Sequence, residues 1–248
     1  MKQSVKIFLL LIAIFGSVFL SSCVHEDGPL TGKTVCLDPG HGGTSDIDSY
    51  RVGVAGEREE WIDLRVALKL KSLLEEKDCR VIMTREKDVA VPLKERALMA
   101  IDGEADAFIS IHHNATADTT VNFPTVYFHG NASENQASVL LGLTIIRQLR
   151  RSLFHADTPV SLVSDHTIFP TAGTAVLRHS YGLPGVIGEA SFFSNPSEEQ
   201  RLKQNDYNDL EAMAYLRGLE EYFSAAPLPV LEKNSLVTIA PFEVFQEA

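Results

Sequence analysis

The sequence predicts a single α/β domain, built on a mostly parallel twisted sheet with helices on both faces. From Lys33 onward, short apolar runs alternate with longer amphipathic segments, as in proteins whose parallel strands are joined by helices. The 248 residues are 45% hydrophobic and 22% charged, which suits one domain with a sizeable core. No internal repeat or low-complexity segment divides the chain.

The apolar runs predict five strands and the amphipathic segments predict four helices. The predicted strands are Thr34–Leu37, Arg80–Met83, Ala107–Ile111, Thr125–Phe128 and Pro184–Ile187, with a further candidate at Thr174–Leu177. The predicted helices are Glu59–Glu76, Leu93–Ile101, Glu134–Leu153 and Asp206–Phe223. The predicted domain therefore spans residues 33–224. A tail follows at 225–248, in which Leu236–Ile239 either adds an edge strand or trails off.

The N-terminus predicts export of the protein. Lys2 and Lys6 precede an apolar run that is short for a membrane-spanning helix, which needs roughly 20 apolar residues. The sequence Leu-Ser-Ser-Cys at 20–23 resembles a bacterial lipoprotein signal, in which the cysteine is acylated and becomes the first residue. The alternative is an ordinary secretory peptide with an incidental cysteine.

We therefore expect a signal peptide at residues 1–22, a lipid on Cys23 and a tether at 23–32. Such an anchor would hold the protein in the cell envelope on the outer face of a membrane, in a periplasmic or other extracytoplasmic position.

Net charge argues against one class of partner, and the cysteine content argues against a disulfide-based fold. The net charge of −11 repels phosphate backbones, so nucleic acid is not an expected partner. Cys36 and Cys79, both in predicted strands, are too few for a disulfide framework. Buried free thiols are expected, although an exported setting permits a bridge.

The loop after the first predicted strand places one histidine among glycines, in Asp-Pro-Gly-His-Gly-Gly at 38–43. Glycines let the backbone turn sharply and approach a bound group closely. Alone, this motif suits His41 as a metal ligand and as a turn residue equally well.

The next predicted helix begins with an acid that faces inward. Ile62 and Val66 belong to its apolar stripe, and Glu59 heads that stripe three residues before Ile62. A carboxylate on a buried face is costly unless a cation or a donor meets it. Acids in the first turn also complement the helix dipole, but that does not explain why one faces inward. Asp63, one turn deeper, is the second candidate. Two other acids of this turn are expected to point elsewhere: Glu57 and Glu60.

Two further strands end in side chains that suit a metal site. The strand Ala107–Ile111 runs into His112 and His113, and neighbouring strand residues point to opposite sides, so periodicity alone does not choose between the two histidines. The strand Pro184–Ile187 is followed closely by Glu189. Ligand sites in open parallel sheets form outside the carboxyl ends of the strands.

These groups are expected to meet at one edge of the sheet. The order of the predicted strands and helices places four groups at that edge: His41, Glu59, one of the two adjacent histidines and Glu189. Two imidazoles and one carboxylate with an open fourth position form a catalytic zinc set, and a further glutamate can act as general base.

Linked motifs in order resemble those of the zinc-dependent N-acetylmuramoyl-L-alanine amidases, the amidase type 3 family. The motifs are Leu-Asp-Pro-Gly-His-Gly-Gly at 37–43, the helix-start Glu59, Met-Thr-Arg at 83–85, Ser-Ile-His at 110–112, and Glu189 with Phe-Ser-Asn-Pro at 193–196. The resemblance covers about Lys33 to Phe223. It implies a Zn²⁺ enzyme that hydrolyses the amide bond between N-acetylmuramic acid and L-alanine in peptidoglycan.

The resemblance also implies roles for single residues, and it favours the first of the two adjacent histidines as the ligand. The implied Zn²⁺ ligands are His41, Glu59 and His112, and the implied catalytic base is Glu189. Candidate substrate contacts are His113, which departs from the small residue common in the family, together with Asn114 and His129.

Some members of the family insert a long helix that covers the zinc until a partner moves it. Here only Ala115–Phe123 separates the Ser-Ile-His strand from the next strand, so no obligatory activator is predicted. Arg85 and Arg96 are expected to be structural, pairing with acids such as Asp88.

Two rival functions stay open. A zinc peptidase acting within the peptide stem would use the same chemistry, because an activated water does not distinguish one amide from another. A non-catalytic wall-binding lipoprotein is the second rival, although such a protein is expected to lack a ligand or the base.

Overall fold

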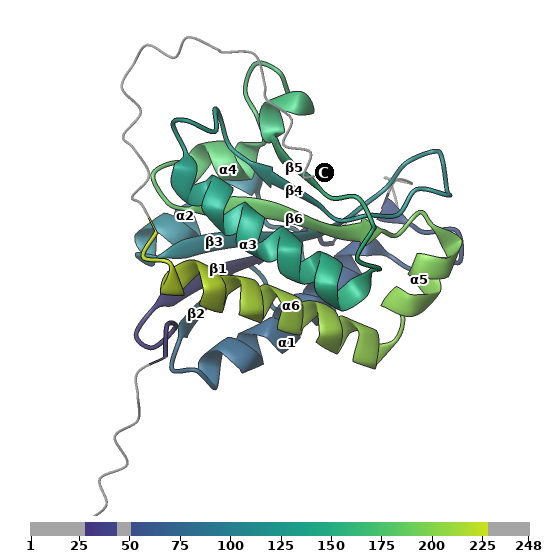
Figure 1. Cartoon of the computed structure of the whole chain (residues 1–248), viewed down its shortest axis with the longest axis horizontal. Coiled ribbons are helices and arrows are strands. Elements are labelled where there is room, and N and C mark those ends of the chain that lie inside the picture. Colours follow the sequence, from purple (N-terminus) through teal and green to yellow (C-terminus); the bar gives the residue numbers. More distant parts are fainter. Residues whose placement is uncertain (1–27, 44–50, 228–248) are drawn as a thin grey trace, which may run out of the picture.

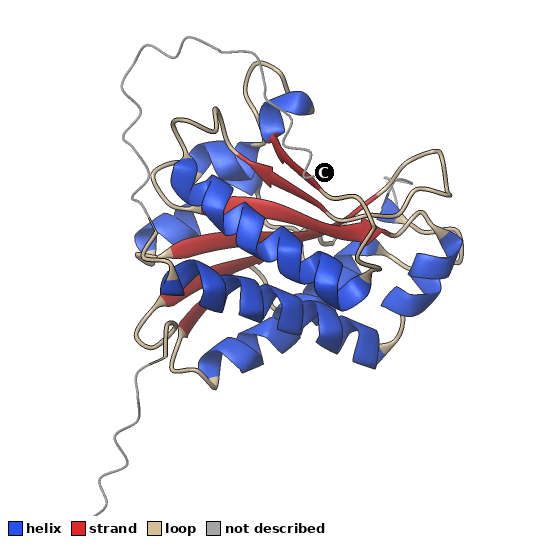
Figure 2. Ribbon diagram, viewed as in Figure 1, coloured by secondary structure: helices blue, strands red, loops and turns tan. Residues whose placement is uncertain are grey.

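Six strands form one sheet in the order β2-β1-β3-β6-β4-β5 in this computed structural model, which describes residues 28–43 and 51–227 (Figures 1 and 2). The strands are β1 (Thr34–Pro39), β2 (Arg80–Met83), β3 (Ala107–Asn114), β4 (Thr125–Phe128), β5 (Ser161–Ser164) and β6 (Gly185–Phe192). The helices are α1 (Glu59–Glu75), α2 (Leu93–Asp102), α3 (Gln136–Leu153), α4 (Ala175–His179), α5 (Pro196–Leu202) and α6 (Asn205–Ser224), with a 3₁₀ turn η3 at Asp165–Thr167.

The sheet is mostly parallel, as predicted. Strands β2, β1, β3 and β6 run parallel to one another, and β4 pairs with β5 in parallel. The one antiparallel junction joins β4 to β6. The carboxyl ends of β1, β3 and β6 therefore share one edge, while those of β4 and β5 lie at the opposite edge.

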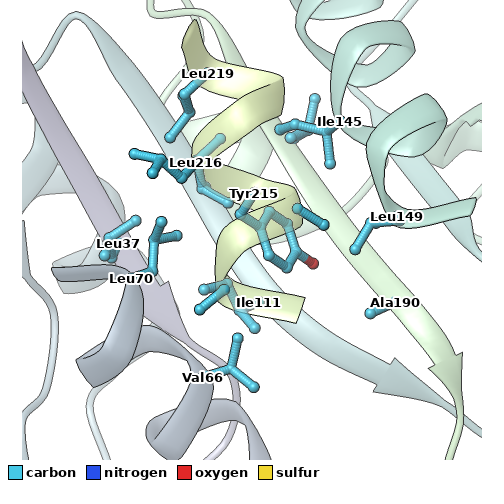
Figure 3. Packing of buried hydrophobic residues seen from close by; sticks show 14 of the residues in the cluster. Leu37, Val66, Leu70, Ile111, Ile145, Leu149, Ala190, Tyr215, Leu216 and Leu219 are labelled. Atoms are coloured by element: carbon cyan, nitrogen blue, oxygen red, sulfur yellow. The ribbon is translucent and has the colours of Figure 1, made fainter. Parts of the chain in front are cut away.

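Helices cover both faces, which confirms the predicted fold class. Helices α1, α3 and α6 pack on one face and α2 and α4 on the other (Figure 1). Residues of β1 alternate between the two cores: Val35 and Leu37 pack with the first group of helices, and Cys36 packs with the second. Figure 3 shows the larger core, where Leu37 lies with residues of α1, α3 and α6.

Helix α6 packs against β6 through one close contact. The hydroxyl of the fully buried Tyr215 donates to the Gly188 carbonyl at 3.0 Å. A Cβ on Gly188 would lie 2.3 Å from the Tyr215 hydroxyl oxygen. Gly188 therefore lets a large aromatic ring of α6 pack directly behind the strand that carries Glu189.

Some element predictions were wrong or incomplete. The candidate strand Thr174–Leu177 is instead the start of α4, whose Val176 and Leu177 pack on the sheet with Cys36 and Ile187. Strand β5 and helix α5 were not predicted, and β3 and β6 extend beyond their predicted ends through Asn114 and Phe192.

Several predictions lie outside the described residues: the signal peptide at 1–22, the lipid site Cys23 and the strand alternative at Leu236–Ile239. Cys36 and Cys79 are free, buried thiols. Among residues 28–43 and 51–227, no helix is both long and apolar enough to cross a bilayer.

Candidate functional site

The turn after β1 brings His41 to the edge of the sheet. His41 adopts a left-handed backbone (φ 56°), and Gly42 and Gly43 follow with φ of 114° and 79°. Gly40 makes a different contribution. A Cβ at this position would lie 2.3 Å from the nearest ring atom of His112, so only glycine lets the turn and that imidazole share the space.

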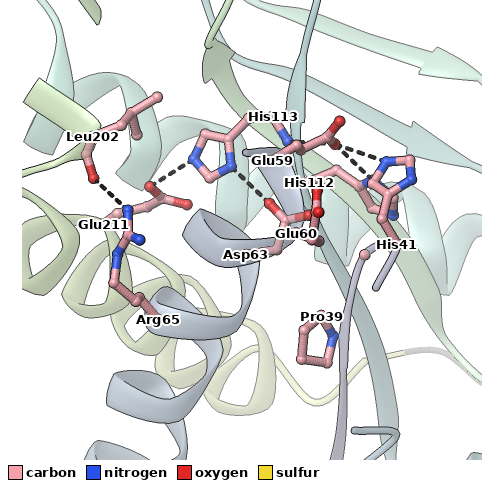
Figure 4. A network of polar contacts seen from close by, with 12 residues as sticks. Pro39, His41, Glu59, Glu60, Asp63, Arg65, His112, His113, Leu202 and Glu211 are labelled. Atoms are coloured by element: carbon pink, nitrogen blue, oxygen red, sulfur yellow. Dashed lines mark hydrogen bonds and ion pairs between the residues drawn. The ribbon is translucent and has the colours of Figure 1, made fainter. Parts of the chain in front are cut away.

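Glu59 is the group on which both imidazoles converge. It is the first residue of α1, is 5% exposed, and reaches over the edge of the sheet. Its Oε1 lies 3.0 Å from His41 Nε2 and 3.1 Å from His112 Nδ1 (Figure 4). The three predicted ligands are therefore brought together.

Glu189 lies beside this group because of strand register. His112 of β3 pairs directly with Glu189 of β6, so the two side chains leave the same face of the sheet. Glu189 Oε2 is buried and has no hydrogen-bond partner. Burial raises the pKa of Glu189 to about 7; the His112 charge opposes this rise, and the nearby Glu59 and Asp63 carboxylates add to it.

The pKa shifts of Glu59 and His112 show how the site balances charge without an ion. Burial opposes ionisation of both groups. Hydrogen bonds from His112 and His41 outweigh it and lower the pKa of Glu59 to about 2. For His112, burial is outweighed by the Glu59 hydrogen bond together with the charges of Glu189, Asp63 and Glu59, which raise the pKa of His112 to about 9. A cation bound here would replace the proton on His112, as expected of a metal site.

The donor set fits a small divalent metal ion. One donor atom from each of His41, Glu59, Asp63 and His112 lies within 4.8 Å of the others. Tetrahedral zinc with bonds of about 2.0–2.2 Å places its ligand atoms about 3.3 Å apart. The separations of 3.0 and 3.1 Å around Glu59 Oε1 are close to that value. Asp63, the second candidate from sequence, is therefore near the site as well.

His113, an expected substrate contact, is among the residues that line the cleft around Glu189, but its imidazole is enclosed within the protein. Its side chain is fully buried between two acids (Figure 4). Nδ1 lies 2.8 Å from Asp63 Oδ1, and Nε2 lies 3.0 Å from Glu211 Oε2. Burial disfavours its charge, but Glu211 and Asp63 outweigh burial and raise the pKa of His113 well above its usual value. The alternation along β3 thus sends His112 to the site and His113 into the protein.

Of the first-turn acids, Glu59 faces the site as predicted, and Glu60 is not among the residues grouped there. Glu60 is also fully buried, and its carboxylate forms an ion pair with Arg58. Helical angle alone did not reveal this, because the loop before α1 folds back and supplies the cation.

Arg85 and Arg96 hold the loop that carries His41. Arg96 pairs with the buried Asp38 at 2.9 Å, rather than with Asp88, and also donates to the His41 carbonyl. Arg85 donates to the carbonyl oxygens of Pro39 and Gly40. Both arginines therefore have the structural role that was predicted, with backbone carbonyls as their main partners.

Two adjoining cavities form a cleft over the site. One, of about 410 Å³, is lined by His41, Glu59, His112 and Glu189, and also by the predicted contact Asn114. The second, of about 620 Å³, shares His41 and His112 with it and extends toward α2 and α4.

The cleft includes residues that the sequence did not single out, and it omits one that was expected. Thr174 and Phe169 line both cavities, and Tyr127 lines the smaller one. For Tyr127, the only sequence signal is the period-two alternation along Thr125–Phe128, which assigns its side chain to one face of the sheet. No sequence pattern indicates that Thr174 and Phe169 line the cleft. His129 lines neither cavity; it is 5% exposed and bonded to Asp165.

An open α/β sheet with two imidazoles, a carboxylate between them and a second glutamate at one edge has the site chemistry of a metal-assisted hydrolase. The family model Amidase_3, N-acetylmuramoyl-L-alanine amidase, matches residues 35–221. The chain belongs to this family of N-acetylmuramoyl-L-alanine amidases.

Relatives and solved structures agree with that assignment. The chain is 30% identical over 212 residues to the germination-specific N-acetylmuramoyl-L-alanine amidase of Bacillus subtilis, covering 79% of this chain and 82% of the relative. It is 31% identical over 205 residues to the probable cell wall amidase LytH of Staphylococcus epidermidis, covering 81% of this chain and 62% of LytH. An N-acetylmuramoyl-L-alanine amidase from Clostridium difficile matches with a TM-score of 0.68 and 28% identity, over 78% of this chain and 97% of that one. The CwlD amidase of Clostridioides difficile, solved with the GerS lipoprotein, matches with a TM-score of 0.67 and 27% identity, over 78% and 99%.

Proposed function

We propose that this chain is a zinc-dependent amidase that hydrolyses the bond between N-acetylmuramic acid and L-alanine in peptidoglycan. The observation that carries the proposal is the convergence of His41 Nε2 and His112 Nδ1 on one oxygen of Glu59, with Glu189 next to His112 on the adjoining strand. Membership of the amidase family supplies the substrate.

In this proposal His41, Glu59 and His112 hold the Zn²⁺. When bound, the ion would act as a Lewis acid on the scissile carbonyl and lower the pKa of a water molecule toward ~7. The buried carboxylates and the turn at Gly40 fix the ligand side chains before any ion arrives. Such preorganisation favours binding in one defined geometry.

Glu189 is the proposed general base. Glu189 lines the cleft, its buried Oε2 has no hydrogen-bond partner, and burial raises its pKa to about 7, which a nearby cation would lower. The carboxylate takes a proton from the attacking water as the new C–O bond forms. It then gives that proton to the leaving nitrogen of L-alanine as the C–N bond breaks. The products are a lactyl carboxylate on the glycan and a stem peptide with a free amine.

We also propose that the protein acts outside the cytoplasm, held to a membrane by an acyl chain on Cys23, and that it needs no activator to open the site. The lipoprotein-like sequence at 20–23 supports the anchor. The short β3–β4 connection supports the open site, because the residues that the structure describes leave the cavity over His41 and Glu189 open.

Product analysis tests the proposed reaction. The full chain, stripped with a chelator and reloaded with Zn²⁺, is expected to release intact stem peptides with a free L-alanine amine from purified peptidoglycan. Mass spectrometry of the fragments distinguishes this product from the cut stems of a peptidase. Fragments cut within the stem would contradict the amidase assignment.

Glu189→Gln is the matched variant for this experiment. It keeps the size of the side chain and removes the base, so the same Zn²⁺ content with a rate lowered about 10²–10⁴-fold is expected. Full activity in the Gln variant would remove Glu189 from the mechanism. No release by wild type under any condition would support the wall-binding alternative.

A further inference from the structure

A second group of metal-binding side chains lies at the opposite edge of the sheet from Glu189. His129 follows β4, and Asp165 and His166 follow β5; these strands are parallel, so their carboxyl ends adjoin. One donor atom from each of the three residues lies within 4.8 Å of the others. Because β4 runs antiparallel to β6, its end lies beside the start of β6, where Phe128 pairs with Val186.

The two oxygens of Asp165 have very different surroundings. Oδ2 accepts hydrogen bonds from the Thr174 N–H at 2.7 Å and the Thr174 hydroxyl at 2.9 Å, and it lies 2.9 Å from His129 Nδ1. Oδ1 is buried and has no hydrogen-bond partner, although Asp165 is 0% exposed. His166 Nε2 lies 3.9 Å from Oδ1.

The hydrogen bonds to Thr174 and His129 satisfy Oδ2 of Asp165, but they do not explain why Oδ1 is buried without a partner. A buried carboxylate oxygen without a partner costs free energy, and native proteins rarely leave one. The His166 nitrogen is too far for a direct hydrogen bond, yet it faces the same oxygen. An ion between them would satisfy both atoms.

The backbone at Gly173 lies close against the Asp165 carboxylate. Gly173 has φ 61°, and a Cβ there would lie 2.4 and 2.6 Å from the two Asp165 oxygens. The rings of His129 and His166 stand edge to face, with 5.4 Å between their centroids. The three donor side chains are thus held by the fold.

We propose that His129, Asp165 and His166 bind a second divalent transition-metal ion, separate from the ion at His41. Two imidazoles and one carboxylate select such ions, Zn²⁺ above all, over Mg²⁺ or Ca²⁺. The segment from Asp165 to Thr174 carries Phe169 and Thr174, which line the catalytic cleft. The second ion therefore fixes the cleft wall and touches no reacting atom.

Counting bound zinc tests the proposal. The full chain is stripped with a chelator, titrated with Zn²⁺ alone and assayed for bound metal after buffer exchange. Wild type is expected to bind two equivalents, His166→Gln one, His41→Gln one and the double variant none. The exposed His155→Gln is the matched control and should bind two. Asp165→Asn, which keeps the shape of the carboxyl, should also bind one.

One equivalent in folded wild type, with His166→Gln equal to it, would overturn the second site. Circular dichroism checks that each variant is folded. The outcome is independent of the proposed catalytic ion: if that site held no metal, wild type and His41→Gln would both bind one equivalent and His166→Gln none. Steady-state kinetics give a second readout, because loss of a cleft-wall ion should raise KM several-fold more than it lowers kcat.

Discussion

Glu59 Oε1 is the atom around which the site is organised, since it contacts one nitrogen of each imidazole. The Glu59 side chain is buried at the start of α1. Its contacts with the two imidazoles explain why an acid at this position faces inward. Because Gly40 has no side chain, the His112 imidazole has room to lie beside Glu59. Small changes around these atoms should therefore affect metal affinity before they affect the fold.

Gly40→Ala tests that statement. The new Cβ would lie 2.3–2.6 Å from atoms of the His112 ring, so the imidazole must leave the position in which it contacts Glu59. We expect Zn²⁺ affinity to fall about 10–100-fold, the range found for disturbed ligand positioning. Competition with a chromophoric chelator measures it, and Gly28→Ala, whose Cβ would meet nothing closer than 3.8 Å, is the control. Equal affinities in the two variants would show that Gly40 does not position the ligand.

Single residues were predictable where a periodic pattern fixed their direction. The helical stripe identified Glu59, and strand alternation showed that only one of His112 and His113 faces the site. The choice between them came from family resemblance, because each side of β3 offers carboxylates: Glu59 to His112, and Asp63 with Glu211 to His113. Glu211 lies 98 residues after His113 in the sequence, so no local pattern predicts the contact between them.

At the scale of elements, the fit between β6 and α6 positions Glu189, the proposed general base. Tyr215 fills the space behind Gly188 and donates to its carbonyl. Strand β6 pairs with β3 on one side and β4 on the other, so Glu189 is fixed by neighbours on both edges. The small residue before Glu189 is therefore a packing requirement of this chain.

Gly188→Ala should destabilise the fold by about 1–3 kcal/mol, the usual cost of overpacking a core. The added methyl would overlap the Tyr215 ring and hydroxyl, with the closest atom at 2.3 Å. Gly185→Ala in the same strand is the matched control, because its Cβ would make ordinary contacts at 3.5 Å. Urea unfolding compares the two free energies of unfolding. Similar values for both variants would contradict this account of the β6–α6 contact.

The long periodic helices were all predicted, whereas the short elements were predicted only in part. Helices α1, α3 and α6 have buried stripes over 17 to 20 residues, whereas β5 has only four residues. Thr174–Leu177 has the composition of a strand, yet β5 already ends the sheet on that side. A short apolar run fits a buried helix or a buried strand, and the neighbours in space decide between them.

At the scale of the whole molecule, the antiparallel junction between β4 and β6 separates two sites. The carboxyl edge of β1, β3 and β6 carries the proposed catalytic ion, and that of β4 and β5 carries the proposed second ion. The segment from Asp165 to Thr174 links them through the cleft wall. This arrangement could not be predicted from sequence, because strand direction at β4 depends on long-range pairing.

The open cleft predicts activity without a partner. The purified chain alone, loaded with Zn²⁺, should hydrolyse peptidoglycan fragments, since about 410 Å³ of cavity lies directly over His41 and Glu189. Release of stem peptides is measured with and without an added envelope lipoprotein fraction, and the rate is expected to be the same. A chain that binds zinc but cuts only after that addition would contradict the open site.

The zinc content of site variants is the most direct test of the central claim, that His41, Glu59 and His112 share one divalent ion beside Glu189. The variants are made in the His166→Gln background, so that only this site is counted. His41→Ala, Glu59→Gln and His112→Ala are each expected to lose the bound zinc together with activity. Glu189→Gln is expected to keep one equivalent and lose activity. Undiminished zinc in folded ligand variants would contradict the account.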